Sequence, residues 1–193
     1  MSHPVGGQEG RHSILLIHAD DRVQANRLGA LVSHYGHSPR ILDEAGLLAG
    51  RLQGEGLLIS CRRFSAEIRL AMAQGLHLPR VLFCDRLTVQ QQADLLTQGA
   101  LMVPHGCGER EPVEQWLRLA RAQLAMVQQQ QQVQDALRLK LEERRLIEQA
   151  KGRLMRHQGL DEEAAYQAMR SAAMAQNHSL AELARRLLQA LPG

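Results

Sequence analysis

The sequence has few aromatic residues, few cysteines and no long apolar run. Phenylalanine, tryptophan and tyrosine together make up 3% of the 193 residues, which argues against the aromatic platforms on which single-stranded nucleic acids stack. The three cysteines, Cys61, Cys84 and Cys107, are not at metal-ligand spacing, so we expect reduced thiols in a cytoplasmic protein with no metal and no cofactor. No apolar run approaches the ~20 residues of a membrane-spanning helix, and we expect no membrane association.

The charges of the chain are close to balance. The net charge is +3 at neutral pH, a value that permits binding to nucleic acid without requiring it. Residues 1–11 contain no hydrophobic segment of the kind that directs a protein to export, and we interpret them as a flexible leader. A chain of this length suits one large domain or two small ones, and the patterns along it favour two.

Between residues 12 and 111, short apolar runs alternate with helical patterns. The apolar runs are 14–17, 40–42, 57–60, 80–84 and 100–103, and the helical patterns are 22–35, 45–52, 65–74 and 88–98. This alternation predicts a five-stranded parallel sheet with helices on both faces. In sheets of this kind, a functional site forms at the carboxyl ends of the strands.

This pattern resembles the receiver domain of response regulators, which has a flavodoxin-like fold. A receiver that accepts a phosphoryl group needs clustered carboxylates to hold Mg²⁺, and a hydroxyl residue and a lysine near the phosphoryl oxygens. Counting along the strands places Asp20 at one of the paired acids but Cys61 at the phospho-accepting aspartate. The hydroxyl position falls on Cys84 and the lysine position on Val103. The resemblance therefore implies a degenerate phosphorylation site, in a pseudo-receiver that aspartyl phosphate does not control.

Two features of this predicted edge of the sheet stay open. A slip of one residue after the fourth strand would supply an acid, Asp85, but no slip supplies an aspartate after the third strand. Cys61 and Cys84 are expected near each other, either as small apolar core residues or as a pair that could form a disulfide. His18 and Asp20 are too few ligands for a specific metal site.

Residues 112–143 have the pattern of a long helix with a coiled-coil seam. Pro112 stands near the start of the helix, and no helix breaker follows until Gly152. Apolar residues recur at spacings of three and four and resume out of phase after the glutamine run 128–132, as in a stutter. Two interpretations remain, a parallel homodimer and a helix folded back on its own receiver-like domain. The predicted dimer seam consists of Leu117, Leu124, Val127, Leu137 and Leu141.

Residues 144–193 predict three helices separated by Gly159 and Asn177. Asp161 is placed to cap the second helix, and Ser179 forms a capping box with Glu182 at the start of the third. Other characteristic positions are Ile147, Ala150, Lys151, Gly152, Leu154, Met155, Glu163, Ala165, Tyr166, Met169, Arg170, Ala173, Met174, Leu180, Leu183 and Ala184. In order and spacing, these residues resemble the ANTAR domain, the C-terminal module of the AmiR and NasT family of transcription antiterminators.

The resemblance implies an RNA-binding protein without enzymatic activity, which binds hairpins in a nascent leader transcript and prevents termination. It also implies control of a nitrate/nitrite or amide operon, through a ligand-sensing partner protein that acts on the pseudo-receiver. The alternatives are a phosphorylation-dependent regulator with the same RNA output and a dimeric adaptor without RNA binding. The candidate RNA-binding residues are Arg144, Arg145, Lys151, Arg153, Arg156, Tyr166 and Arg170.

The same residues also admit structural interpretations. The charged stretch could be a solvated helix face with local ion pairs, and Tyr166 could close the core of the helical bundle instead of stacking on a base. Gly152 inside a helix costs ~1 kcal/mol relative to alanine. Its presence indicates the close approach of another helix or of the RNA backbone.

Overall fold

The computed structural model describes residues 13–49, 52–105 and 112–191. The predicted leader and Cys107 lie outside the described residues. Contacts along the chain define two compact units, Met1–Gln129 and Gln130–Gly193, which we call unit 1 and unit 2. Within the described ranges, no helix is both long enough and apolar enough to cross a membrane.

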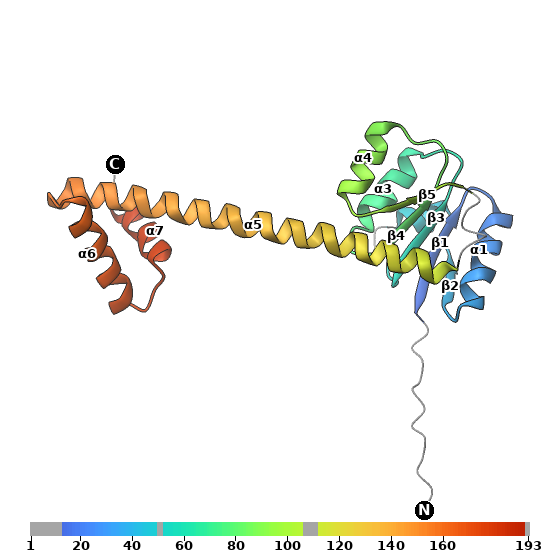
Figure 1. The fold of residues 1–193 in the computed structure, drawn as a ribbon, viewed down its shortest axis with the longest axis horizontal. Helices are drawn as coiled ribbons and strands as arrows, with labels where there is room; N and C mark the ends of the chain where they lie inside the picture. Colours follow the sequence, from blue (N-terminus) through green and yellow to red (C-terminus); the bar gives the residue numbers. More distant parts are fainter. Residues whose placement is uncertain (1–12, 50–51, 106–111, 192–193) are drawn as a thin grey trace, which may run out of the picture. The chain divides into compact units, whose positions relative to one another are not determined.

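Unit 1 contains a five-stranded parallel sheet whose strands are joined by helices (Figure 1). The strands are β1 (Ile14–Ala19), β2 (Ser38–Ile41), β3 (Gly56–Ser60), β4 (Arg80–Phe83) and β5 (Leu101–Val103). The helices between them are α1 (Arg22–His34), α2 (Glu44–Leu48), α3 (Ala66–Gln74) and α4 (Val89–Thr97). The spatial order β2-β1-β3-β4-β5 is that of flavodoxin-like folds, so the predicted fold class is confirmed.

Local signals set the starts of these helices. Each N-cap side chain accepts a hydrogen bond from a backbone N–H in the first turn of its helix. These caps are Asp21, Asp43, Ser65 and Thr88. Helix α2 is shorter than the predicted 45–52, because it ends at Leu48 and Leu52 packs in the core outside the helix.

The core of unit 1 consists of two apolar clusters, one on each face of the sheet. Alternate residues of a strand point to opposite faces, and Leu16 of β1 joins one cluster while Leu15 and Ile17 join the other. Residues of α2, α3 and α4 complete the first cluster. The second contains α1 residues and, in addition, the first turns of the long helix α5 (Val113–Gln158).

The start of α5 belongs to unit 1. Leu117 and Ala120 are fully buried against the sheet, and Leu124 is 7% exposed. Gly99 has a φ of +75°, and a Cβ there would lie 3.1 Å from the Cα of Leu124, so glycine is required at this approach. Unit 1 therefore extends past the predicted domain boundary at residues 111 and 112. Leu117 and Leu124 of the predicted dimer seam are buried within this unit.

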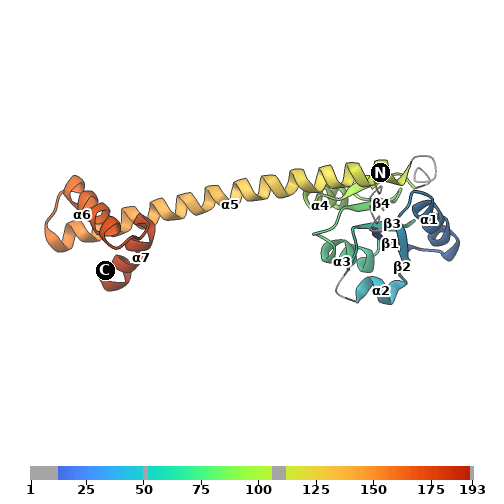
Figure 2. The ribbon, with the colours of Figure 1, turned by 90° about the horizontal axis from the view of Figure 1, so that it is seen from below.

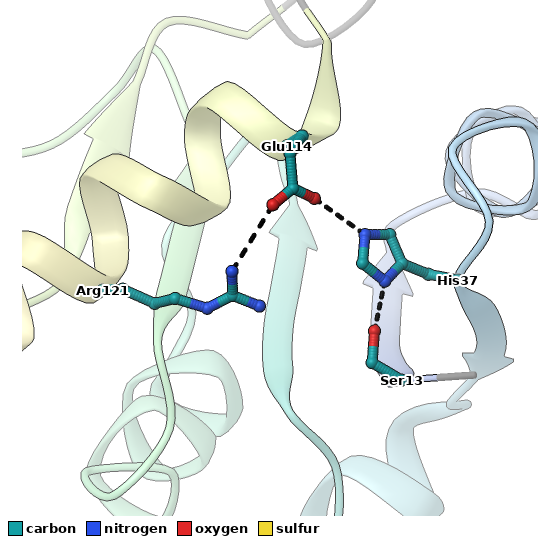
Figure 3. A network of polar contacts seen from close by, with 4 residues as sticks. All are labelled: Ser13, His37, Glu114 and Arg121. Carbon is teal, nitrogen blue, oxygen red and sulfur yellow. Dashed lines mark hydrogen bonds and ion pairs between the residues drawn. The ribbon is translucent and has the colours of Figure 1, made fainter. Parts of the chain in front are cut away.

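A polar network holds the first turns of α5 to the sheet (Figure 3). Glu114 accepts a hydrogen bond from Nε2 of His37, with an Nε2–Oε2 distance of 2.9 Å, and its Oε1 is 3.5 Å from Nη1 of Arg121. Because a carboxylate only accepts, Nε2 of His37 carries the proton of this bond, and Nδ1 of the same ring contacts the hydroxyl of Ser13. The network joins residues before β1, before β2 and in α5.

The middle of α5 has a different environment from its start. Val127 is half-buried, and its Cβ lies 3.5 Å from the position that a Cβ of Gly99 would occupy. Beyond it, Val133, Leu137 and Leu141 are 53%, 56% and 69% exposed. The glutamine run continues the helix without a break, consistent with the good helix propensity of glutamine. Of the predicted seam, only Leu137 and Leu141 remain strongly exposed apolar residues.

Unit 2 consists of the end of α5 with α6 (Glu162–Ala175) and α7 (Leu180–Ala190) (Figure 2). The first of the three predicted helices is continuous with the connector rather than separate. Gly159 (φ +66°) follows α5, and Asn177 (φ 55°) lies between α6 and α7. Asp161 caps α6, and Ser179 forms the predicted capping box of α7. The buried residues of unit 2 that form its core are Ala150, Leu154, Ala165, Met169, Ala173, Leu183 and Ala184.

Candidate functional site

The carboxyl ends of β1, β3, β4 and β5 meet at one edge of the sheet, because the strand register aligns their last residues. Asp20, Cys61 and Cys84 each follow one of these strands directly, and Val103 is the last residue of β5. The backbone N–H of Cys61 donates to the carbonyl of Phe83 (2.9 Å), and that of Cys84 donates to Val103 (3.0 Å). The structure thus places the four residues of the predicted degenerate phosphorylation site at one edge.

Asp20 and Asp85, which follow β1 and β4 at this edge, each hold a loop. Oδ2 of Asp20 accepts from the backbone N–H of Arg62 (2.7 Å), and Oδ1 of Asp85 accepts from that of His105 (2.7 Å). No group of three or more histidine, cysteine or acidic side chains in the described parts of the chain could hold a metal ion. The carboxylate cluster that binds Mg²⁺ in a working receiver therefore has no counterpart among these residues.

Cys61 and Cys84 are buried free thiols. Burial, followed by the neighbouring Cys84, raises the pKa of the Cys61 thiol well above its usual range. Since the thiolate is the nucleophile in disulfide exchange, a raised pKa disfavours that reaction at Cys61. The geometry favours the interpretation of both cysteines as small core residues at positions where a receiver has its acceptor and hydroxyl.

The predicted RNA-binding residues of unit 2 fall into two groups, and the first group faces inward. Lys151 is 8% exposed, and its Nζ lies 2.7 Å from carboxylate oxygens of both Glu148 and Glu162. Hydrogen bonds to these carboxylates raise the pKa of Lys151, and the bond from Lys151 lowers the pKa of Glu162. Because Glu162 begins α6, this ion pair joins α5 to α6.

Arg153 also holds helices together. Its Nη1 donates to the carbonyl of Leu188, at 2.8 Å, and to the carbonyl of Leu191. A cation at the C-terminal end of a helix satisfies unpaired carbonyls and complements the helix dipole, so Arg153 joins α5 to the end of α7. Since the cations of Lys151 and Arg153 are engaged inside unit 2, we leave both residues out of the proposed RNA interface.

The second group faces outward. Arg144, Arg145 and Arg156 are exposed on α5. Arg145, Gly152 and Arg156 follow the spacing i, i+7, i+11 and therefore share one helix face. Within the described residues, nothing lies within 4 Å of a Cβ built at Gly152. Close packing of a second helix is thus the wrong explanation for Gly152, and this face of the helix leaves room for an approaching backbone.

Tyr166 and Arg170 form a second exposed pair, on α6. They are four residues apart and so lie on the same helix face, and Tyr166 is 37% exposed. Their neighbours Ala165 and Met169 point into the core of unit 2, to which Tyr166 does not belong. The interpretation that Tyr166 closes this core is therefore not supported, and its ring stays accessible at the surface.

Unit 1 contains a parallel sheet with a receiver-like strand order, and a helical unit follows it along the chain. Residues 135–188 match the ANTAR domain, so this chain carries an ANTAR domain at its C-terminal end, as predicted. The chain is also 47% identical over 75 residues to the nitrate regulatory protein of Klebsiella oxytoca. That similarity covers 39% of this chain and only 19% of the length of the relative.

Proposed function

We propose that the chain is an RNA-binding transcription antiterminator that binds hairpins in a nascent leader transcript. The observation that carries this proposal is an ANTAR domain in which Arg145 and Arg156 flank the open Gly152 on one exposed helix face. Arginines that contact phosphates supply most of the affinity for RNA. On α6, Tyr166 is accessible for stacking on an unpaired loop base, with Arg170 beside it.

The proposed mechanism requires no chemical reaction. Binding to one RNA fold stabilises that fold by RT ln(1 + [L]/Kd), which amounts to about 2.7 kcal/mol when the free protein is at 100 times its Kd. A shift of this size favours the antiterminating hairpin over the terminator. The proposal places the protein in the cytoplasm, where transcripts are made, and assigns it no enzymatic activity.

We infer that a partner protein, rather than aspartyl phosphate, controls the receiver-like unit. The support is the pair Cys61 and Val103, which stand where a receiver has its acceptor aspartate and its lysine. The partner in this proposal senses a small ligand. Similarity to a nitrate regulatory protein favours a nitrate or nitrite signal over the amide class.

Fluorescence anisotropy with a labelled two-hairpin leader RNA tests the RNA-binding proposal. We expect Arg156→Ala and Arg145→Ala to weaken binding and to lower the salt slope of log K by about 1 each. Arg185→Ala is the matched control, since Arg185 is exposed on α7 outside the proposed face. Absence of binding even at low salt would support an adaptor without RNA binding.

Incubation with acetyl phosphate and Mg²⁺ tests the control mechanism. We expect no acid-stable, hydroxylamine-sensitive phosphoryl label, because the described edge offers no aspartate after β3 to accept the group. Stoichiometric labelling of an aspartate would instead establish a phosphorylation-dependent regulator with the same RNA output.

A further inference from the structure

A cavity opens at the carboxyl edge of the sheet, beside the degenerate acceptor position. It has a volume of about 410 Å³ and is lined by Arg62, Arg63, Asp85, Arg86 and His105. These residues follow β3, β4 and β5, so three separate segments converge on it. We propose that this cavity binds a small polyanion that carries a phosphate or pyrophosphate group.

The charges of the cavity support an anion. Three guanidinium groups and one imidazole face one carboxylate, that of Asp85, which already accepts a hydrogen bond from the backbone of His105. Among the residues that the structure describes, no carboxylate forms an ion pair with Arg62, Arg63 or Arg86. Unpaired cations that line one concave surface create a positive potential, and the planar guanidinium matches phosphate oxygens through paired N–H donors.

The charge of this cavity is the reverse of that at the phosphorylation site of a working receiver. There, clustered carboxylates hold a cation, whereas Asp85 is the one carboxylate that lines this cavity, and one of its oxygens accepts a hydrogen bond from the backbone N–H of His105. The acidic side chains Asp20, Asp43, Glu44 and Glu67 line a neighbouring pocket, which shares Arg63 with the cavity. A divalent cation would meet three arginines at this cavity. An anion meets the same groups with favourable electrostatics, so the residues select against Mg²⁺ and for phosphate chemistry.

The volume of the cavity favours a small molecule over a macromolecule. Pockets for small ligands have volumes of ≈ 300–1,000 Å³, and this cavity falls within that range. Its lining comes from short segments at strand ends rather than from an extended charged surface. The inference concerns unit 1 alone and stands independently of the RNA-binding proposal for unit 2.

Isothermal titration calorimetry of the full chain with inorganic pyrophosphate, at constant ionic strength, tests the proposal. We expect the double variant Arg63→Gln/Arg86→Gln to weaken pyrophosphate binding by at least about tenfold. Arg69→Gln is the matched control, because Arg69 is an exposed arginine on α3 that does not line the cavity. It should leave the affinity unchanged.

Asp85→Asn separates an anion site from a cation site. Loss of the one lining carboxylate should tighten pyrophosphate binding by roughly threefold, while the amide oxygen can still accept from the backbone of His105. The thermal transition of each variant without ligand serves as the check on folding. If the glutamine variant unfolds, the double variant Arg63→Lys/Arg86→Lys takes its place in the titration. Lysine keeps the charge but loses the paired N–H donors, so this variant should also bind pyrophosphate more weakly than the wild type.

Four results would overturn the proposal. They are the absence of pyrophosphate binding at millimolar concentration, equal weakening by Arg69→Gln, Mg²⁺ binding that Asp85→Asn abolishes, and competitive displacement of pyrophosphate by the leader RNA or by an acidic peptide. The last result would assign the cavity to a macromolecular partner instead of a small anion.

Discussion

Two stretches of α5 carry apolar residues at the same helical spacing but have different surroundings. Leu117, Ala120 and Leu124 are buried in unit 1, whereas Leu137 and Leu141 are more than half exposed. The first stretch has a sheet to cover it, and no described residue covers the second to a comparable degree. The spacing of apolar residues therefore identifies a helix face, while only the tertiary fold shows what packs on it.

The largest expected effect is a difference in the free energy of unfolding between variants in the buried stretch and variants in the exposed stretch of α5. Leu117→Asp places a carboxylate in the core and should lower the free energy of unfolding of unit 1 by about 3–5 kcal/mol. Leu137→Asp should change it by less than about 0.5 kcal/mol. Urea denaturation followed by tryptophan fluorescence reports on unit 1, because Trp116, the single tryptophan, packs edge-to-face against Phe83. Equal losses in both variants would show that the exposed stretch is buried in solution.

The second prediction concerns what covers the exposed stretch. We propose that Leu137 and Leu141 pair in a parallel homodimer, since Val133 extends the same face at helical spacing. The double variant Leu137→Asp/Leu141→Asp should raise the dimer dissociation constant by at least about tenfold. Analytical ultracentrifugation measures it, with Gln132→Asp as a control on a different side of the helix. A wild-type chain that is monomeric at high micromolar concentration rules out this dimer.

The third prediction concerns the end of α5, where the side chain of Lys151 is buried in unit 2 and that of Arg156 is exposed to solvent. Arg156→Ala should weaken leader-RNA binding by about fivefold and leave the melting temperature unchanged. Lys151→Ala should lower the melting temperature of unit 2, because it leaves the carboxylates of Glu148 and Glu162 without their shared cation. Circular dichroism and anisotropy on the same samples separate the two effects. If Arg156→Ala lowered the melting temperature and Lys151→Ala weakened RNA binding alone, Arg156 would be the structural residue and Lys151 the RNA contact.

The smallest expected effect is the pH dependence of the pair formed by Lys151 and Glu162. The hydrogen bond from Lys151 lowers the pKa of Glu162 from 4.5. Hydrogen bonds to Glu148 and then to Glu162 raise the pKa of Lys151 from 10.5. The depressed acid stabilises the fold above pH 4.5 and loses this contribution as the pH falls through its folded pKa. The raised amine contributes below pH 10.5 and loses its contribution as the pH rises through its folded pKa.

A double-mutant cycle with Lys151→Met and Glu162→Gln measures this contact. The coupling energy should be smaller at pH 3 than at pH 7, because protonation of Glu162 removes one charge of the pair. Glu148 stays in place in all four proteins and continues to pair with Lys151 where the lysine is present. A coupling energy that does not change between these pH values would show that packing, rather than charge, joins α5 to α6.

Features set by neighbours in the sequence were predictable. The alternation of apolar runs predicted the sheet, and the caps Asp161 and Ser179 are placed as expected. Each of these signals acts within three residues of its partner, so the sequence pattern contains the whole interaction. The order of these elements along the chain predicted the receiver-like fold, and the ANTAR resemblance predicted the three-helix unit.

Features set by distant neighbours were not predictable. Arg153 has the same appearance in sequence as Arg156, but its carbonyl partners lie 35 and 38 residues further along the chain. The basic cavity was missed for the same reason, because Arg62, Arg86 and His105 come together only at the ends of three strands. From the sequence alone, the presence of Arg62 and Arg63 after the third strand indicated only that the acceptor aspartate is missing there, and not that these arginines line a cavity.

The burial of the first turns of α5 also affects the order of events during synthesis. Domains generally fold as units, the N-terminal one first, as the chain emerges from the ribosome. One face of the sheet in unit 1 is completed by Leu117 and Ala120, which come after every strand in the chain. Part of this apolar face of the newly made sheet therefore stays uncovered until the first turns of α5, which continues into unit 2, have emerged.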